Sequence, residues 1–331
     1  MLDLALVQAA RARIAGRVHV TPTMTSSMLG ARVGVRLFHK CENFQKTGSF
    51  KSRGALNKVG DLGEDARRRG VVTFSAGNHA QALAWAARAA NVACTVVMPT
   101  WATATKVDAS RGYGAEVVLH GTSGIEALAK ANELVSQRGL VFVHPFDDEL
   151  IAAGQGTAAL ELLEQTEGLD VVVVPIGGGG LIAGIATAVK GISPRTRIYG
   201  IEPEGAAAMR ASLDAGRPVR LDAVKTIADG LAAPMAGTLN YDVVRRLVDD
   251  VILVSDAVIA DGLRELVTYT KLLAEPAGAT ATAALLSGAV PVKPGERVAC
   301  IVSGGNVDLG RLVSETRDGI GERVGKPATN D

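Results

Sequence analysis

The amino-acid sequence predicts an α/β protein whose sheets are mainly parallel. Short β-rich runs alternate with Ala-rich helical stretches for most of its length, and this alternation is typical of βαβ units. Hydrophobic residues make up 47% of the 331 residues, aromatic residues only 4%, and glycine occurs 38 times. This composition favours an Ala-, Val- and Gly-rich α/β enzyme, with its core in one large or two medium domains.

The expected elements follow one another in a regular order. We expect strands at Val35–Phe38, Val71–Phe74, Cys94–Met98, Glu116–Leu119, Val141–His144, Val171–Ile176, Arg197–Ile201 and Val298–Ser303. Helices are expected at Ala80–Ala90, which Asn91 is placed to end, and at Leu181–Lys190. No internal repeat or low-complexity segment interrupts this pattern, and no linker in the composition marks a domain boundary.

Charge and composition argue against several classes of partner. The net charge is +1, from 35 basic and 34 acidic residues, which favours neither nucleic acid nor an anionic membrane. The few aromatic residues also argue against a stacking platform for single strands. The uncharged stretch Val171–Val189 is long enough to span a membrane. Because it contains Pro175 and four consecutive glycines, we interpret it as a buried strand, a loop and a helix.

The cysteines indicate a reducing compartment. Cys41, Cys94 and Cys300 are odd in number and widely spaced, so we expect no disulfide framework and no paired zinc site. This usage predicts a cytoplasmic location. The N-terminal segment carries Asp3 and no basic region, so we expect no signal peptide. The remaining histidines show no metal-ligand spacing, so we assign no role to His19, His39, His120 or His144.

Lys51 is the first candidate for chemistry. It lies in Thr47-Gly48-Ser49-Phe50-Lys51-Ser52-Arg53-Gly54-Ala55. Ser49 is expected to cap a helix, which places Lys51 in the first turn. The positive helix end and partial burial both favour the free amine, which a Schiff base with an aldehyde needs. The alternative is an ordinary surface lysine among Lys40, Lys46 and Lys58.

The second candidate is the loop Ser75-Ala76-Gly77-Asn78-His79-Ala80-Gln81, which follows a predicted strand and opens a helix. Backbone N–H groups at such a turn form an anion site. The alternative is an ordinary helix cap, in which Ser75 or Asn78 satisfies unpaired N–H groups and does nothing more. The loop alone does not decide between the two.

The third candidate is the glycine loop, Pro175-Ile176-Gly177-Gly178-Gly179-Gly180-Leu181-Ile182-Ala183-Gly184. Four glycines let the backbone approach a phosphate and direct several N–H groups at it, and the following helix adds its dipole. No Lys-Ser or Lys-Thr follows, so this is not a Walker A loop. Gly178-x-Gly180-x-x-Ala183 also fits a relaxed dinucleotide fingerprint, with Glu202 spaced for a ribose contact, so NAD is an alternative.

The last candidates lie near the C-terminal end of the pattern. Ser303-Gly304-Gly305-Asn306 follows a predicted strand, where a serine is usually a turn residue. Glu275-Pro276-Ala277-Gly278-Ala279 is either part of a site or only a helix break at Pro276.

Together with His39-Lys40-Cys41-Glu42-Asn43-Phe44-Gln45, these segments resemble, in the same order, the serine/threonine dehydratase and serine racemase family. Members of this family are fold type II (tryptophan synthase β-like) enzymes that depend on pyridoxal 5'-phosphate (PLP). The resemblance runs from about Thr21 to Leu309. It implies two three-layer α/β/α domains: a large one of residues 1–65 and 148–322, a small inserted one of residues 66–147, and a frayed tail at 323–331. It also implies a homodimer and a cofactor in the cleft between the domains.

The resemblance assigns roles residue by residue. Lys51 carries PLP and is the catalytic residue. The other implied cofactor-binding residues are Phe50, Asn78, Gly177, Gly178, Gly179, Gly180, Leu181, Glu275, Ser303 and Gly304. The implied substrate-binding residues are Ser75, Ala76, Gly77, Asn78 and His79. Since the four glycines match the phosphate loop of the family, PLP ranks far above NAD.

The implied reaction is a β-elimination. Freed Lys51 removes the α-proton of a hydroxy-amino acid, the cofactor stabilises the carbanion, and the β-hydroxyl group leaves. Hydrolysis then gives a 2-oxo acid and ammonia. By the same resemblance, Ser303 contacts the pyridine nitrogen with a neutral hydroxyl. Because this hydroxyl does not enforce a protonated ring, as a carboxylate would, the carbanion is less delocalised into the ring. This suits prompt loss of the β-leaving group.

Departures from the family pattern narrow the function. Serine racemases carry a serine acid/base where this chain has Ala76, so we expect a threonine and/or serine dehydratase. Racemases also bind a divalent ion through Glu, a carbonyl and Asp. Here Glu202 and Ala206 align, but Ala208 stands at the Asp position, so we expect no essential metal. The chain ends soon after Asn306, so no isoleucine-binding regulatory domain is expected.

Other functions stay open at this stage. They are a β-hydroxyaspartate or related dehydratase, a serine racemase, a sulfide-using synthase, a ligand-binding relative without activity and, remotely, an NAD-binding Rossmann protein. A β-hydroxyaspartate enzyme needs a cation for the second carboxylate, and the sequence alone does not place one.

Overall fold

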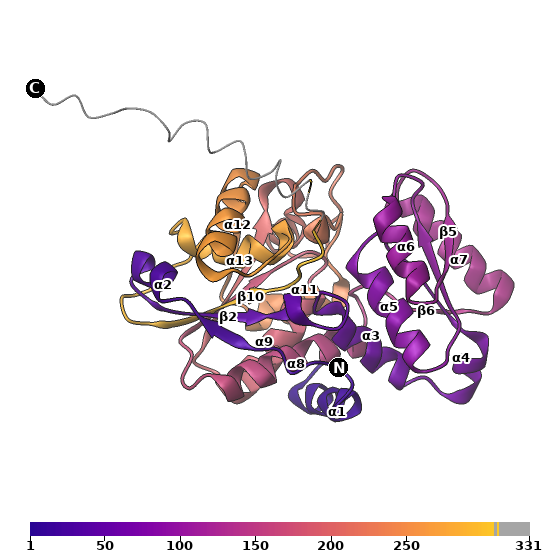
Figure 1. Ribbon diagram of the computed structural model, residues 1–331, viewed down its shortest axis with the longest axis horizontal. Coiled ribbons are helices and arrows are strands. Elements are labelled where there is room, and N and C mark those ends of the chain that lie inside the picture. Colours follow the sequence, from indigo (N-terminus) through magenta and orange to yellow (C-terminus); the bar gives the residue numbers. More distant parts are fainter. Residues whose placement is uncertain (308–309, 311–331) are drawn as a thin grey trace, which may run out of the picture.

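A computed structural model describes residues 1–307 and 310. Within them, the chain forms a six-stranded and a four-stranded sheet, each with helices on both faces (Figure 1). The predicted α/β class, with mainly parallel sheets in two three-layer units, is confirmed. The tail expected at residues 323–331 lies outside the described residues.

The bounds of the elements are as follows. The α-helices are α1 Leu4–Ile14, α2 Ser27–Val33, α3 Lys51–Gly60, α4 Glu64–Arg69, α5 Asn78–Ala89, α6 Ala104–Gly112, α7 Gly124–Arg138, α8 Glu149–Gln165, α9 Gly180–Ile192, α10 Ala208–Ala215, α11 Thr238–Leu247, α12 Asp256–Thr270 and α13 Pro276–Leu286. The 3-10 helices are η1 Glu42–Phe44, η2 Glu204–Ala206 and η3 Asp229–Leu231. The strands are β1 Thr23–Thr25, β2 Arg36–Cys41, β3 Val71–Phe74, β4 Cys94–Met98, β5 Glu116–Leu119, β6 Val141–Phe142, β7 Val171–Pro175, β8 Arg197–Pro203, β9 Asp250–Val254 and β10 Arg297–Val302.

The larger sheet has the strand order β1-β2-β10-β7-β8-β9, and the smaller one β5-β4-β3-β6. Every pair is parallel except β1 with β2. All strands of the smaller sheet fall within residues 66–147, and all strands of the larger sheet fall outside them. The exact domain boundaries stay a prediction.

The central strand β7 explains why the larger sheet needs two layers of helices. Val172 and Val174 join the core made with α1, α8, α9 and α11, whereas Val171 and Val173 join the core made with α2, α12 and α13. A parallel strand covered on both faces is continuously apolar, and the four valines of β7 show this pattern.

Helix α3 connects the two units. In Figure 1 it lies between the larger sheet and the group formed by α4 to α7 with the smaller sheet. Its apolar residues Ala55, Leu56 and Val59 pack into the core of the smaller sheet. On another side it crosses α8 so closely that a Cβ added to Gly54 would lie 2.6 Å from the Ile151 carbonyl oxygen. The helix that begins with Lys51 is therefore fixed by both units.

The strand predictions differ from the structure mainly at the ends. The predicted strand Val141–His144 stops at Phe142, because the His144 side chain turns back to accept backbone N–H bonds. The prediction at Val35–Phe38 becomes β2, which extends to Cys41 because it pairs with β10 to the end. Strands β1 and β9 were not predicted, and β1 has only three residues.

The uncharged stretch at 171–189 forms β7, the glycine loop and most of α9, as predicted. Among the residues that the structure describes, no helix is both long and apolar enough to cross a bilayer. Cys41, Cys94 and Cys300 are free and buried, and burial raises the pKa of each thiol to about 12.

Candidate active site

Lys51 is the first residue of α3 and is half-buried. Its Nζ donates to the carbonyl oxygen of Pro145 at 2.8 Å and lies 5.2 Å from the centre of the Phe50 ring. Burial lowers the pKa of the amine to about 8. At neutral pH a usable fraction of this lysine is the free amine that attacks an aldehyde.

The predicted helix cap at Ser49 is wrong. The N-cap residue is Phe50, in a helical conformation and without a side-chain cap, and the Ser49 hydroxyl is buried without a partner among the described residues. The reason is that Ser49 pairs with Gly304 in an isolated β-bridge. Phe50 N–H also donates to the Ser303 carbonyl at 3.1 Å, so the backbone before Lys51 is bound to the end of β10.

Helix α3 is anchored by a buried group of charges that we call the charge cluster: Lys40, Glu42, Arg53 and Glu161. The Arg53 guanidinium bonds both carboxylates, with Nε donating to Glu42 at 2.7 Å and Nη1 to Glu161 at 2.6 Å. Lys40 Nζ donates to Glu161 at 2.8 Å. The two cations of the cluster balance its two carboxylates. The cluster joins β2, η1, α3 and α8, and its Arg53 lies two residues after Lys51.

The loop at residues 75–79 opens α5, as predicted. Ser75 Oγ accepts from Gly77 N–H at 3.2 Å, so it satisfies one N–H group of the turn. The N–H groups of Ala76, Asn78 and His79 have no acceptor among the described residues. These free donors at a helix N-terminus suit a carboxylate.

Asn78, Glu275 and Asn306 form one hydrogen-bonded chain. Asn78 Nδ2 donates to Glu275 Oε1 at 2.6 Å, and Asn78 Oδ1 accepts from Asn306 Nδ2 at 2.9 Å. Burial raises the pKa of Glu275 to about 7, although the bond from Asn78 opposes this. The Asn78 amide is therefore held in one orientation by residues about 200 or more positions away in sequence, as the separations of 197 and 228 show.

His79 is buried beside Lys51. A contact with the Val143 backbone favours the protonated ring, but less than burial and the Lys51 charge disfavour it. Burial and the Lys51 charge hold the pKa of His79 well below its usual range, so its imidazole is neutral.

The glycine loop has the form of an anion cradle. Gly178, Gly179 and Gly180 are buried, and a Cβ added to Gly178 would lie 2.3 Å from the Phe146 ring. Gly179 has φ +92°, a conformation that favours glycine. Within the described residues, no acceptor faces any of the five successive N–H groups from Gly177 to Leu181. The Leu181 side chain packs in the core, so only its backbone is available to a ligand.

Ser303 and Gly304 lie next to the backbone of Ser49 and Phe50. The Ser303 hydroxyl is buried and donates to the Ala277 carbonyl at 3.3 Å. Gly304 leaves room for Glu275, because an added Cβ would lie 2.3 Å from Glu275 Oε1 and would displace this side chain. Because Glu275 N–H donates to the Gly304 carbonyl at 3.1 Å, the Ser303 and Glu275 segments hold each other in place.

The contacts therefore bring all the predicted segments together around Lys51. The sequence reading missed the segment after β6: Pro145 accepts from Lys51, and Phe146 packs on the glycine loop. His144 was assigned no role, yet its Nδ1 accepts from Phe146 and Asp147 N–H at 3.2 and 2.8 Å and shapes this turn. In the sequence, this segment could have been found from the apolar run that ends in His144-Pro145-Phe146.

Glu202 does not offer a free carboxylate to a ribose. Its two oxygens accept from the N–H groups of Met209 and Arg210, each at 2.8 Å, at the start of α10. Burial raises the pKa of Glu202 to about 7. In the described residues, no three His, Cys, Asp or Glu side chains gather as metal ligands.

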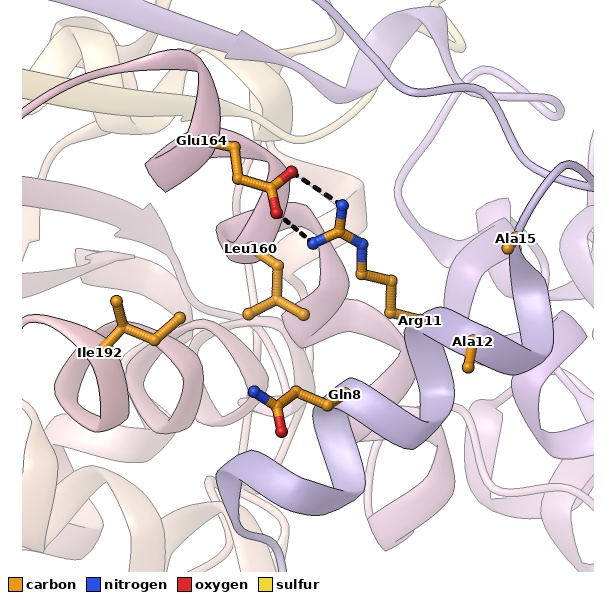
Figure 2. Close-up of a pocket in the computed structure, with 7 residues that line it drawn as sticks. All are labelled: Gln8, Arg11, Ala12, Ala15, Leu160, Glu164 and Ile192. Atoms are coloured by element: carbon orange, nitrogen blue, oxygen red, sulfur yellow. Dashed lines mark hydrogen bonds and ion pairs between the residues drawn. The ribbon is translucent and has the colours of Figure 1, made fainter.

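A separate hollow of about 400 Å³ lies between α1, α8 and the end of α9 (Figure 2). The Arg11–Glu164 ion pair closes one side of it. It contains none of the predicted site residues, so its wall has no share in the chemistry around Lys51.

These residues fit PLP on three independent features. Lys51 supplies a buried amine for the aldehyde, the glycine loop supplies unpaired N–H groups for the phosphate, and Ser303 supplies a neutral hydroxyl. The atoms that an added Cβ on any of Gly177 to Gly180 would meet first include no carboxylate, which suits a phosphate site.

Several known proteins are similar to this chain over most of its length. A family model described as "Pyridoxal-phosphate dependent enzyme" matches residues 14–304. An L-threonine ammonia-lyase of Thermotoga maritima is 42% identical over 94% of this chain and 77% of its own length. A serine racemase of Oryza sativa is 43% identical over 94% of this chain and 92% of its own. The solved structure of maize serine racemase superposes with a TM-score of 0.91 at 42% identity, covering 96% of this chain and 97% of the other. The chain therefore belongs to the family of pyridoxal-phosphate dependent enzymes, with the fold type II architecture and PLP as its cofactor.

Proposed function

We propose that the protein is a threonine dehydratase, which converts L-threonine to 2-oxobutyrate and ammonia and accepts L-serine in the same way. The observation that carries the proposal is Lys51: its amine is buried, has a pKa of about 8 and bonds a neutral carbonyl. Such a group both holds the cofactor and, once free, takes the α-proton. Bound PLP supplies the electron sink for the resulting carbanion.

The other residues position the substrate. The free N–H groups of Ala76, Asn78 and His79 suit the substrate carboxylate, so the loop binds it through backbone donors while the His79 ring is neutral. Asn78, Glu275 and Ser303 would hold the cofactor ring, and the backbone N–H groups from Gly177 to Leu181 would hold its phosphate. The similarity to L-threonine ammonia-lyases and to the catabolic L-threonine dehydratase TdcB of Escherichia coli, 43% identical over 92% of both chains, supports the choice of substrate.

Serine racemisation is the second candidate, because relatives named serine racemase are equally similar. Racemisation needs a proton donor on the face opposite Lys51. Ala76 has no proton to give at the position where the resemblance places a serine, so elimination is the better-supported reaction.

The test is the absorbance of the purified protein before and after L-threonine, L-serine or DL-threo-β-hydroxyaspartate, with 2-oxo acid and D-serine assayed in parallel. We expect a Schiff-base band and 2-oxobutyrate from threonine. Turnover of hydroxyaspartate alone would overturn the substrate, D-serine without 2-oxo acid would favour the racemase, and no band after PLP addition would overturn the Lys51 assignment.

We also propose a cytoplasmic location and a homodimer. Three buried, free thiols support a reducing compartment, and the family resemblance supports the dimer. Light scattering after size exclusion tests the second point, where a monomeric mass would contradict it.

A further inference from the structure

Three successive residues after β6 are each held by a different group. The Pro145 carbonyl accepts from Lys51 Nζ at 2.8 Å, and the Phe146 carbonyl accepts from Asn240 Nδ2 at 3.0 Å. The Asp147 carboxylate accepts from the first two N–H groups of α11, at 3.0 and 3.1 Å. Helix α11 thus fixes the segment that binds the amine of Lys51.

Asn240 joins this segment to the glycine loop. Its Nδ2 also donates to the Gly178 carbonyl at 2.8 Å, and Gly237 N–H donates to the same oxygen at 3.0 Å. The side chain is fully buried, and its Oδ1 has no partner in the described part of the chain. Both amide hydrogens therefore go to carbonyls, one in the segment after β6 and one in the glycine loop.

The hydrogen bonds to the Gly178 carbonyl also fix the direction of the Gly179 N–H. In a trans peptide the C=O of one residue and the N–H of the next point in opposite directions, and the Gly178–Gly179 peptide is trans. Since two donors of the α11 region hold the Gly178 carbonyl, the Gly179 N–H points away from α11. A Cβ added to Gly179 would lie 2.8 Å from Asn240 Cβ, so the contact also requires glycine there.

We propose that Asn240 is a positioning residue for the cofactor phosphate. It sets the direction of the Gly179 N–H and ties the phosphate loop to the segment that binds Lys51, although it touches neither the substrate nor the aldehyde. The inference rests on the assignment of the glycine loop to the phosphate in the proposed function.

The proposal makes a prediction that depends on the phosphate. PLP and pyridoxal share the ring and the aldehyde, but pyridoxal has no phosphate. An Asn240→Asp variant keeps the shape of the side chain and loses both donated bonds. We expect the affinity for PLP to fall by roughly 10- to 100-fold, the range of one hydrogen bond to a charged group, while the affinity for pyridoxal changes by less than about 3-fold.

The experiment titrates the full-length apo-enzyme with PLP and with pyridoxal, following the Schiff-base absorbance, and records thermal unfolding of each apo-variant. Asn240→Ala is measured beside Asn240→Asp, because it removes the same donors without burying a charge. The control is Asn57→Asp, another fully buried amide, which donates to the Leu150 carbonyl at 2.7 Å and does not contact the loop.

The outcomes separate the inference from the proposed function. A selective loss for PLP in both Asn240 variants, and not in Asn57→Asp, supports the positioning role. Equal losses for PLP and pyridoxal, or no loss for either, would overturn it. If the wild type itself binds both aldehydes equally, the glycine loop is not the phosphate site, and the inference falls with that assignment.

Discussion

No carboxylate forms an ion pair with Lys51 in the part of the chain that the structure describes. Its Nζ donates to the Pro145 carbonyl, and burial lowers its pKa to about 8. A neutral partner stabilises the ammonium less than a carboxylate would, so burial determines the direction in which the pKa of the amine shifts. The residue is thereby suited to act first as an amine and then as a base.

Lys51→Ala should remove both functions. We expect the Schiff-base absorbance to disappear and 2-oxobutyrate formation from threonine to fall by about 10²- to 10⁴-fold or more, the usual contribution of a positioned acid or base. Lys46→Ala is the matched control, because Lys46 is exposed in the same segment. An absorbance band that persists in Lys51→Ala would mean that another lysine carries the cofactor.

Ala76→Ser should change the outcome of the reaction. The new hydroxyl stands beside the free N–H groups of the substrate loop, at the position where the family resemblance places the second acid/base. We expect D-serine to form from L-serine, detected by chiral chromatography, while 2-oxo acid formation continues. Ser75→Thr, which keeps a hydroxyl in the loop, is the control; no D-serine from Ala76→Ser would show that the methyl group of Ala76 is not what prevents racemisation.

At the scale of elements, α3 is the part on which the site depends. The smaller sheet packs against its apolar residues, α8 crosses it at Gly54, and the charge cluster anchors its first turn. Because Lys51 is its first residue, any shift of α3 moves the amine relative to the glycine loop.

Arg53→Met tests the charge cluster. The substitution leaves Glu42 and Glu161 without their main partner, and one uncompensated buried charge costs about 3–5 kcal/mol of unfolding free energy. Arg11→Met is the control, because its partner Glu164 is exposed and such surface pairs contribute about 0–1 kcal/mol. Denaturant unfolding of the two variants measures the difference, and equal costs would contradict an anchoring role for the cluster.

At the scale of the whole molecule, stability should depend on pH through His39. This residue is fully buried on β2 without ring partners among the described residues, and burial lowers its pKa from 6.5 to about 4. Between these two values the unfolded chain binds the extra proton, so the contribution of His39 to stability is complete above pH 6.5 and is lost as the pH falls towards 4. The lowering of the His39 pKa from 6.5 to about 4 corresponds to about 3 kcal/mol of unfolding free energy.

Unfolding free energies measured from pH 4 to 7 in wild type and His39→Leu test this dependence. The variant should lack this part of the slope, because leucine does not titrate. His120→Leu serves as the control, since His120 is exposed. An unchanged slope in His39→Leu would assign the acid sensitivity to other groups.

Local patterns in the sequence predict the elements and the segments of the site, because apolar runs and glycine turns act over a few residues. Strand ends are less predictable: β6 stops early through the His144 side chain, and the Ser49 cap fails through pairing with Gly304. Asn240 lies beyond such reasoning, since its partners are 62 and 94 residues away. A buried amide that bonds two distant carbonyls has no local signature.

The strand order also determines when a nascent chain can complete each sheet. The smaller sheet is complete once residue 142 has left the ribosome, whereas β10, which separates β2 from β7, is the last strand among the described residues. Until residues 297–302 emerge, β2 and β7 each keep an unpaired edge in a partly finished sheet. Capture of the cofactor must therefore follow synthesis of residues 297–302, and the unfinished larger sheet is the state most in need of a chaperone.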